Sequence, residues 1–356
     1  LRGTAAAFAA GTGGADGVTV TPFDRMIGQP ADLGRRIARN TQIILQDESS
    51  LGRIADPLAG SWYGEELTDE VAKAGWERFR EIEREGGALA ALRSGLIATT
   101  LAGLADERED DLNHRRRVMT GINEFPLLGD DGTEPQVPDR SKVAGDGARL
   151  NQRPELSGFG RLTEALPGER LAAATSLASS GARIDELDAA VAGEAFSLPG
   201  LNPRHDAIPF EKMRRAALEH EKSGGERPQI YLACMGTIAS HVSYANWAKS
   251  FFEVAGVETV PSGALDGNEA QAKTLADGGF RMTAICAGRN QSPEDLADLV
   301  ARLREAGAEY IFMVNSTPEL NEAAMKAGAD ELVRNGLNLS VVLTATLDRL
   351  GVEGKA

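Results

Sequence analysis

The sequence predicts an α/β protein: an incomplete set of βα units, a linker, and a complete five-stranded parallel domain. Strand and helix patterns alternate before residue 127 and again after residue 228, which indicates parallel βα units. Gly is abundant (40 residues) and aromatic residues are few (5%), as suits many tight strand–helix turns. A Gly- and Pro-rich stretch separates the two parts. We therefore divide the chain into residues 1–127, 128–227 and 228–356.

The first part shows about two βα units. Residues 1–10 predict a helix packed through small Ala side chains, and 14–23 (GADGVTVTPF) a buried strand rich in β-branched residues. A helix is expected over 35–46, and residues 56–63 are expected to end in a short aromatic strand. Two such units cannot close a sheet, because both edges would stay unpaired. We interpret this part as the end of a larger barrel.

The remainder of the first part predicts helices. Thr68 is the expected N-cap of a helix that runs to about Glu85, where two glycines stop it, and residues 88–104 continue as helix. The chain has no initiator Met, and Leu1 opens directly into a helical pattern. We therefore expect it to have been cut at its N-terminus from a longer protein.

Residues 128–227 predict a linker with helices. The stretch 129–160 is rich in Gly, Asp, Pro and Arg, with few periodic apolar positions. Helical character appears over 162–191, and a further helix is expected to begin near Pro209. The segment SGGERP at 223–228 marks a boundary.

The last part, 228–356, predicts five consecutive βα units. The expected strands are 230–235, 258–260, 282–286, 310–314 and 331–333, and the expected helices are 242–254, 268–276, 293–306, 318–327 and 339–350. Five parallel strands with helices on both faces describe a flavodoxin-like sheet. Ligands of such sheets bind beyond the carboxyl ends of the strands.

Charge and composition exclude several classes of function. The net charge of −15 disfavours nucleic acid and anionic membrane surfaces as partners. No apolar run approaches the roughly 18 residues of a membrane helix. Cys234 and Cys286 each lie in an apolar run that predicts a buried strand, with neither disulfide nor metal-ligand spacing. A reducing, cytoplasmic setting is expected.

Three stretches resemble the methylmalonyl-CoA mutase family: GGADGVTVTPFD (13–24), RRIARNTQIILQDESSLGRIADPLAGSWYGEELT (35–68) and TGINEFP (120–126). The resemblance implies that residues 1–127 are the C-terminal portion of a (β/α)8 TIM barrel, followed after a linker by a cobalamin-binding-type domain. It also implies coenzyme A thioesters as substrates and adenosylcobalamin radical rearrangement as the chemistry. In catalytic relatives, the neighbourhood of Gln46, Asp47 and Glu48 faces the corrin, although such residues also commonly cap helices.

The cobalt-ligand motif of catalytic relatives, Asp-x-His-x-x-Gly, is absent. His241 follows the first expected strand of the last part, but Ala239 and Tyr244 replace the acid and the glycine. A ligating histidine needs an orienting partner for its second nitrogen, so a helix-terminal or interface role is expected for His241. The remaining histidines also lack the motif at those offsets: His114 (Leu112, Arg117), His205 (Pro203, Ile208) and His220 (Leu218, Ser223).

Two further loops depart from the catalytic pattern. Catalytic relatives carry Ser-x-Leu after the third strand and Gly-Gly after the fourth, whereas this chain has ICAGRNQSP (285–293) and MVNSTPEL (313–320). The side chains of Asn315 and Ser316 would occupy space that the cofactor tail needs. We therefore assign no catalytic, cofactor-binding or metal-ligating residue to this chain.

The resemblance thus implies the non-catalytic small subunit of a heterodimeric, adenosylcobalamin-dependent methylmalonyl-CoA mutase, which interconverts methylmalonyl-CoA and succinyl-CoA. Its partner would be the catalytic large subunit, which would carry the cofactor and the acyl-CoA. Two alternatives stay open. One is a catalytic chain that uses His241 in a displaced loop, and the other is a stand-alone α/β ligand-binding module.

Overall fold

The computed structural model describes residues 1–26, 28–129, 156–164, 166, 168–192, 198, 200–201, 205–263, 265 and 267–352. Within these bounds the chain forms two compact units, one from 1–96 with 133–200 and the other from 97–132 with 201–356. The predicted linker residues 130–155 lie outside the described residues. The three-part division drawn from the sequence stays a prediction, and each unit is described here by itself.

The second unit is built on a parallel sheet of five strands in the order β2-β1-β3-β4-β5. The strands are β1 (Gln229–Met235), β2 (Glu258–Pro261), β3 (Met282–Ala287), β4 (Tyr310–Val314) and β5 (Glu331–Val333). Each lies within one residue of its predicted bounds. The flavodoxin-like α/β sheet is therefore confirmed.

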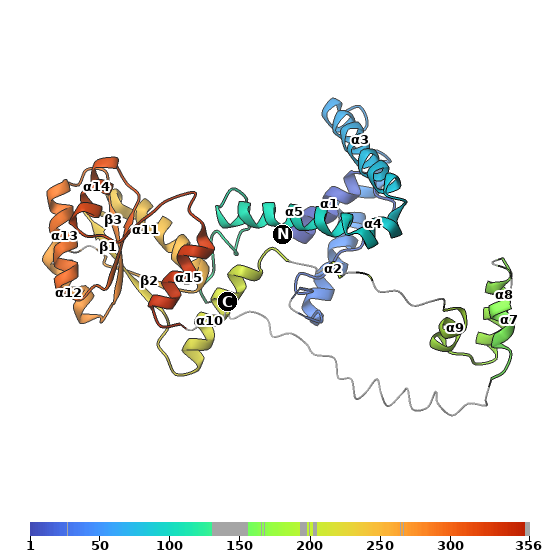
Figure 1. The fold of residues 1–356 in the computed structure, drawn as a ribbon. Coiled ribbons are helices and arrows are strands. Elements are labelled where there is room, and N and C mark those ends of the chain that lie inside the picture. Colours follow the sequence, from blue (N-terminus) through green and yellow to red (C-terminus); the bar gives the residue numbers. More distant parts are fainter. Residues whose placement is uncertain are drawn as a thin grey trace. The chain divides into compact units, whose positions relative to one another are not determined.

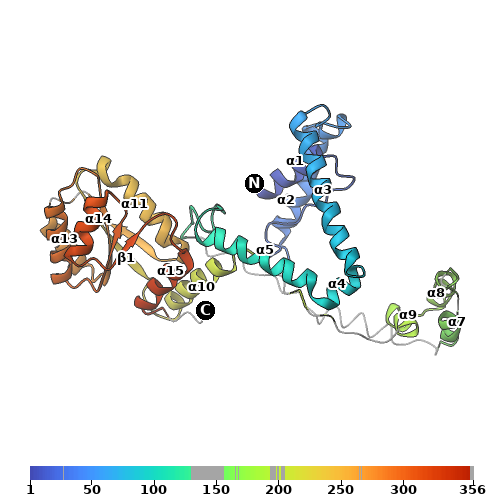
Figure 2. The ribbon, with the colours of Figure 1, turned by 45° about the horizontal axis from the view of Figure 1, so that its top comes forward.

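Helices cover both faces of this sheet (Figures 1 and 2). They are α11 (Ile238–Phe252), α12 (Asn268–Asp277), α13 (Pro293–Glu305), α14 (Pro318–Ala327) and α15 (Leu339–Arg349), with a 3-10 turn at Glu253–Ala255. Helices α12, α13 and α14 lie on one face, and α11 and α15 lie on the other. Alternate residues of β1 accordingly enter two different cores: Ile230 faces α11 and α15, and Tyr231 faces α13.

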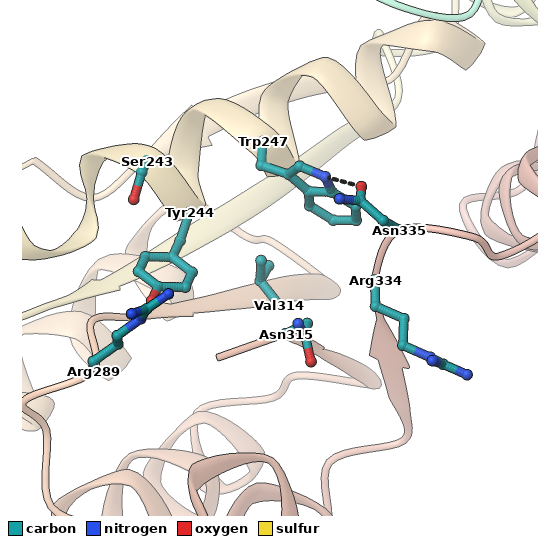
Figure 3. Close-up of a pocket in the computed structure, with 8 residues that line it drawn as sticks. All are labelled: Ser243, Tyr244, Trp247, Arg289, Val314, Asn315, Arg334 and Asn335. Atoms are coloured by element: carbon teal, nitrogen blue, oxygen red, sulfur yellow. Dashed lines mark hydrogen bonds between the residues drawn. The ribbon is translucent and has the colours of Figure 1, made fainter. Parts of the chain in front are cut away.

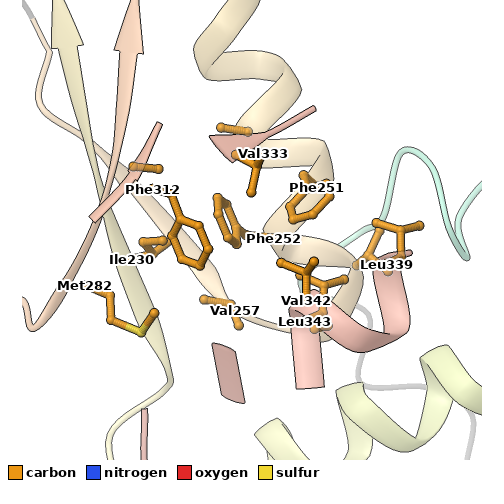
Figure 4. Packing of buried hydrophobic residues seen from close by; sticks show 14 of the residues in the cluster. Ile230, Phe251, Phe252, Val257, Met282, Phe312, Val333, Leu339, Val342 and Leu343 are labelled. Atoms are coloured by element: carbon orange, nitrogen blue, oxygen red, sulfur yellow. The ribbon is translucent and has the colours of Figure 1, made fainter. Parts of the chain in front are cut away.

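The core under α11 and α15 is aromatic at its centre (Figure 4). The rings of Phe252 and Phe312 lie 5.1 Å apart, and Phe251 meets Phe252 edge-on at 5.1 Å. All three side chains are at most 1% exposed. Burying one such side chain contributes about 1.5–3 kcal/mol. Because both faces are covered, the strands are nearly continuous apolar runs.

Capping side chains set where several of these helices begin. A side-chain oxygen accepts a backbone N–H at Ser292 before α13, at Thr317 before α14 and at Asn338 before α15. Helix α11, however, begins at Ile238, four residues before the predicted start at Val242. Gly236 takes a left-handed turn (φ +80°) and the N-cap Thr237 is extended, so the connection from β1 is short and His241 falls inside the helix.

The TGINEFP stretch fastens the end of α5 (Leu96–Asn113) to the sheet domain. The fully buried Asn123 amide donates to the carbonyls of Leu112 and Arg117 and accepts from the backbone N–H of Met119. Arg214, on α10 (Ile208–Lys222), donates to carbonyls on both sides of this contact, at Gly121 and Val254. The TGINEFP stretch, which carries part of the family resemblance, thus connects the end of α5 to the sheet domain.

The regular elements described in the first unit are helices, joined by turns and irregular segments, with a single bridge residue at Gln29. Its helices are α1 (Arg2–Thr12), α2 (Asp32–Ile43), α3 (Trp62–Arg84), α4 (Ala88–Ser94), α7 (Phe159–Glu164), α8 (Arg170–Ser179) and α9 (Ile184–Val191), with a π turn at Ile44–Glu48 and a 3-10 turn at Leu51–Arg53. Helices α7, α8 and α9 pack on one another, as both views show.

Two strands predicted in this unit are wrong. Residues 14–23 are irregular, and the segment expected to end as a strand at Tyr63 instead enters α3, which Ser61 caps by accepting from the Gly64 N–H at 3.3 Å. The helix start predicted at Thr68 is also wrong, because α3 already begins at Trp62 and Thr68 lies inside it. A strand needs hydrogen-bonding neighbours, and no described residue of this unit supplies one. The barrel is not confirmed.

Helix α3 carries apolar side chains that are exposed to solvent. None of its 23 residues is buried, and Trp62 (91% exposed), Tyr63 (75%), Val71 (63%) and Trp76 (60%) face outward. The predicted stop is confirmed, because Gly86 and Gly87 follow with positive φ. Among the described helices, none is long and apolar enough by itself to cross a membrane; α4 and α5, bent by 67° where they meet, satisfy that length and composition only as a pair.

Candidate functional site

The carboxyl edge of the parallel sheet is where the candidate site lies. Strand β2 lies on one side of β1, whereas β3, β4 and β5 follow one another on its other side. The strand order therefore reverses between the adjacent strands β1 and β3. A doubly wound sheet opens a crevice at such a switch point, because the two flanking connections leave on opposite faces. The loops that follow β1 and β3 therefore decide what this edge can hold.

Protein atoms fill that crevice. A Cβ added to Gly236, after β1, would collide with the side chains of Gln291 and Ser240. A Cβ added to Gly288, after β3, would come within 2.7 Å of the Ser240 carbonyl oxygen. Both glycines thus make room for the first turn of α11 and for Gln291, so they leave no cradle for a cofactor tail.

His241 is positioned by α11 and has no orienting acid. Its side chain is 5% exposed, and its Nδ1 has no hydrogen-bond partner among the described residues. The backbone N–H of His241 donates to the Thr237 carbonyl at 3.3 Å, so the residue belongs to the first turn of the helix. His241 therefore lies in the first turn of α11, and its helix-terminal or interface role stays a prediction.

The loop after β4 is closed by a second set of side chains. Asn321, on α14, donates from its amide to Asn315 Oδ1 and accepts the backbone N–H of Ser316, both at 2.9 Å. Ser316 Oγ is buried without a partner among the described residues. The residues of this edge therefore do not fit a cobalamin: side chains crowd Gly236 and Gly288, and Nδ1 of His241 has no orienting partner among the described residues.

A pocket of about 240 Å³ remains at this edge, under α11 (Figure 3). Its lining comes from Ser243, Tyr244, Trp247, Arg289, Val314, Asn315, Arg334 and Asn335. Trp247 Nε1 donates to Asn335 Oδ1 at 2.7 Å, which fixes the indole. In Figure 3 the Arg289 side chain lies beside Tyr244, whereas Arg334 extends away from Val314.

The chemistry of this pocket is that of binding. Its lining holds no carboxylate, histidine or cysteine, so it offers no general acid or base that works near neutral pH. It is also smaller than the roughly 300–1,000 Å³ of pockets for drug-sized ligands. A small polar or anionic molecule fits it, and a corrin does not. Sequence reasoning missed Arg289 and Asn335; their positions directly after β3 and β5 were the available signal.

Cys234 and Cys286 meet in the core just below this edge, and both are buried, as predicted. The Cys234 thiol donates to the Leu232 carbonyl and the Cys286 thiol to the Ala284 carbonyl. The neighbouring Cys286 side chain, together with His241, lowers the pKa of Cys234 against the opposing effect of burial. The Cys234 side chain and full burial raise the pKa of Cys286. Among the described residues, no group of three or more His, Cys, Asp or Glu side chains is placed to hold a metal ion.

A second, larger groove lies elsewhere in this unit, between α5, α10 and α15. Its volume is about 1,090 Å³, and its floor is apolar, with Leu104, Met213 and Leu347 among its lining. An ion pair between Arg108 and Asp206 (2.7 Å) stands at its rim. The groove exposes the apolar side of α5, on which Leu101 and Leu104 are 46% and 56% exposed.

Gln46, Asp47 and Glu48, in the first unit, are all exposed and belong to the π turn that prolongs α2. They prolong the helix that the sequence predicts over 35–46 by two residues, to Glu48.

Comparisons with known proteins find similarity to one enzyme family. Residues 1–155 match the family model described as methylmalonyl-CoA mutase. The chain is 35% identical over 352 residues to the methylmalonyl-CoA mutase small subunit of Streptomyces virginiae, covering 99% of this chain and 47% of that protein. It is 27% identical to the small subunit of Propionibacterium freudenreichii subsp. shermanii (99% and 46% covered) and 27% identical to the methylmalonyl-CoA mutase of Escherichia coli K12 (93% and 47%).

The chain spans about half the length of the curated relatives it matches. Across that half, however, the similarity is continuous from the helical unit to the end of the sheet unit, since 99% of the chain is covered. Residues 1–155 therefore resemble the methylmalonyl-CoA mutase family, and over nearly all its residues the chain is similar to proteins named as the small subunit of that enzyme.

Proposed function

We propose that this chain is part of the non-catalytic small subunit of a heterodimeric, adenosylcobalamin-dependent methylmalonyl-CoA mutase. Its role is to pack against and stabilise a catalytic large subunit, which holds the cofactor and interconverts methylmalonyl-CoA and succinyl-CoA. The setting we propose is the cytoplasm, in keeping with two free cysteines.

The observation that carries this proposal is an intact sheet whose switch-point crevice is filled by the chain's own atoms. Ser240 and Gln291 occupy the space at Gly236 and Gly288, while the sheet around them keeps all five strands. A fold that persists without room for its ligand is retained for packing. The exposed apolar surfaces on α3 and α5 support the same role, because contiguous apolar surface of this kind marks contact with other polypeptide.

The first experiment tests partnership. A longer protein containing these residues is co-expressed with a relative that carries an intact Asp-x-His-x-x-Gly motif, and the two are co-purified. A stable complex is expected, since obligate interfaces bury on the order of 2,000 Å² or more. Methylmalonyl-CoA turnover with adenosylcobalamin should be undetectable for the small-subunit protein alone and should appear when the partner is added. Equal turnover without the partner would contradict the proposal.

The second experiment tests cofactor binding directly. Ultraviolet–visible spectra of cobalamin mixed with the parent protein and with His241→Ala are expected to be the same, because His241 has no orienting carboxylate and no crevice above it. Ala239→Ser is a matched control on the same turn. A histidine-dependent spectral shift that His241→Ala abolishes would favour the catalytic alternative.

A stand-alone ligand-binding module is the second candidate, and the pocket beside Arg289 favours it. Inorganic phosphate is a suitable probe for that guanidinium. If the module is the correct assignment, phosphate should raise the melting temperature of the parent, and Arg289→Ala should remove the effect while Arg281→Ala, an exposed arginine before β3, should keep it.

A further inference from the structure

Cys234 and Cys286 are paired in register on adjacent strands. Cys234 on β1 is the direct partner of Cys286 on β3, and both side chains enter the same core, under α11 and α15. Neighbouring strands lie roughly 4.7–4.9 Å apart, which falls inside the 4.4–6.8 Å range of Cα separations that disulfides span. The two thiols are therefore placed where rotation of the side chains can bring the sulfurs together.

The surroundings make the two thiols unequal. Each thiol donates to a carbonyl of its own strand, Cys234 to Leu232 (3.5 Å) and Cys286 to Ala284 (3.8 Å). The neighbouring Cys286 side chain, together with His241, lowers the pKa of Cys234, whereas the Cys234 side chain and full burial raise the pKa of Cys286. The unpartnered Nδ1 of His241 is consistent with a ring held by packing beside these thiols. A thiolate is the reactive form of cysteine toward oxidants. Cys234 is thus the attacking thiol, and Cys286 is the neutral thiol beside it.

We propose that Cys234 and Cys286 form a reversible oxidation site in which a peroxide generates an intrachain disulfide between β1 and β3. In the first step the Cys234 thiolate attacks one oxygen of hydrogen peroxide, the O–O bond breaks, and after one proton is taken up the products are a sulfenic acid and water. In the second step the Cys286 thiol attacks the Cys234 sulfur, the S–O bond breaks, and a second water leaves with the disulfide formed. Two electrons pass from the thiols to the peroxide.

The position of Cys234 gives a small oxidant a short path. Cys234 is 3% exposed, but it lies two residues before Gly236, which is exposed at the carboxyl edge of the sheet. Hydrogen peroxide is close to water in size, so a brief opening of the β1–α11 connection admits it. The disulfide would tie the two strands that border the filled crevice. This site does not depend on the proposed subunit role, because it uses only residues of the sheet core.

The experiment treats the folded chain with hydrogen peroxide, blocks remaining thiols and maps tryptic peptides without reduction. The expected product joins peptides 223–249 and 282–289 and is lighter than their sum by two hydrogen atoms; a thiol reductant should separate them. In Cys286→Ala, Cys234 should instead accumulate as sulfenic acid that dimedone traps. His241→Gln should slow the reaction several-fold, while Asn246→Ala, at an exposed residue of the same helix, should leave its rate unchanged.

Several outcomes would overturn the proposal. The first two are a disulfide that forms only in urea and a disulfide that forms only between two molecules. The others are a Cys234 sulfenic acid in the parent with the Cys286 thiol still free, and no reaction under conditions that oxidise free glutathione. Cooperative thermal melting of each variant before treatment shows that a lost link reflects chemistry and not unfolding. Loss of partner binding in the co-purification experiment would leave this result unaffected, so the two proposals fail separately.

Discussion

The sheet unit and the helix α3 of the first unit bury their apolar residues to opposite degrees. In the sheet, Phe251, Phe252 and Phe312 are at most 1% exposed, and both faces are covered by helices. On α3, which is longer than any helix around the sheet, Trp62 is 91% exposed and no residue is buried. The sheet unit therefore contains its own core, whereas the apolar side chains of α3 are stabilised only by polypeptide from elsewhere.

This difference shows that a stretch with a specific family resemblance can still bury few of its side chains. The long block at 35–68 is among the stretches that resemble the family most closely, yet its residues form helices and turns with few buried side chains. Among the described residues, few side chains of this block are buried against a neighbour, and no neighbouring strand favours strand over helix there.

The largest effect is expected from cutting the chain. A fragment of residues 1–126 should show no cooperative thermal transition and should aggregate, because it keeps the exposed apolar side chains of α3 and loses the sheet unit, whose Ser250 carbonyl accepts from Arg115. Light scattering and calorimetry measure this. A monomeric fragment with a sharp thermal transition would contradict the contrast with the sheet unit, because it would show that residues 1–126 form a core of their own.

Within the sheet unit, Phe312→Ala should lower the free energy of unfolding by about 3–5 kcal/mol, the usual cost of a large cavity in a close-packed core. Phe79→Ala on α3 is the matched control. Phe79 is 48% exposed, so its loss should change that free energy by no more than about 0.5 kcal/mol. Urea denaturation of both variants gives the two values, and similar values would contradict the contrast.

Asn123→Ala should cost about 1–3 kcal/mol, because it removes the acceptor of the Met119 backbone N–H and the side-chain donor to the carbonyls of Leu112 and Arg117. Asn246, exposed on α11, provides the control substitution to Ala. Hydrogen exchange of the amides near Met119 should accelerate in Asn123→Ala only. An unchanged exchange pattern would show that TGINEFP is not the joint between α5 and the sheet.

A smaller, pH-dependent effect is expected at Glu253. Burial raises the pKa of this carboxyl against the hydrogen bond from Thr259, so the folded protein holds the proton more tightly than the unfolded chain does. The resulting stabilisation is present below the ordinary glutamate pKa and is lost as the pH rises through the folded value. Glu253→Gln should therefore be more stable than the parent at pH 7, by under about 1 kcal/mol.

The Glu253→Gln advantage should shrink as the solution is made acid, since the parent carboxyl then becomes neutral too. Urea midpoints measured between pH 4 and pH 7 follow this trend. A Glu253→Gln variant that is less stable than the parent at pH 7 would mean that the charged form is favoured where it lies.

The smallest effect on stability is expected on α3. Val71→Ser should change the free energy of unfolding of the chain by no more than about 0.5 kcal/mol, because 63% of that side chain is already exposed. The same change should reduce self-association, measured by light scattering at rising concentration. A clear loss of stability would show that α3 is packed in solution after all.

The sequence alone sufficed to predict the sheet domain. Its five strands are continuous apolar runs between Gly, Pro and capping residues, so local pattern and final structure agree to within one residue at each strand end. The resemblance also identified the family. The same reasoning was wrong at residues 14–23 and at Tyr63, where a β-branched or aromatic pattern takes strand form only if a neighbouring strand supplies hydrogen bonds.

Only the tertiary structure decided the character of the sheet edge. The loops already departed from the catalytic pattern in sequence, but that Ser240 and Gln291 fill the crevice depends on α11 starting at Ile238, and no periodicity marks that start. The pairing of Cys234 with Cys286 likewise spans 52 residues and depends on strand order. Sequence patterns report what each segment prefers locally, whereas register and crevice contents are set by contacts between segments far apart in the chain.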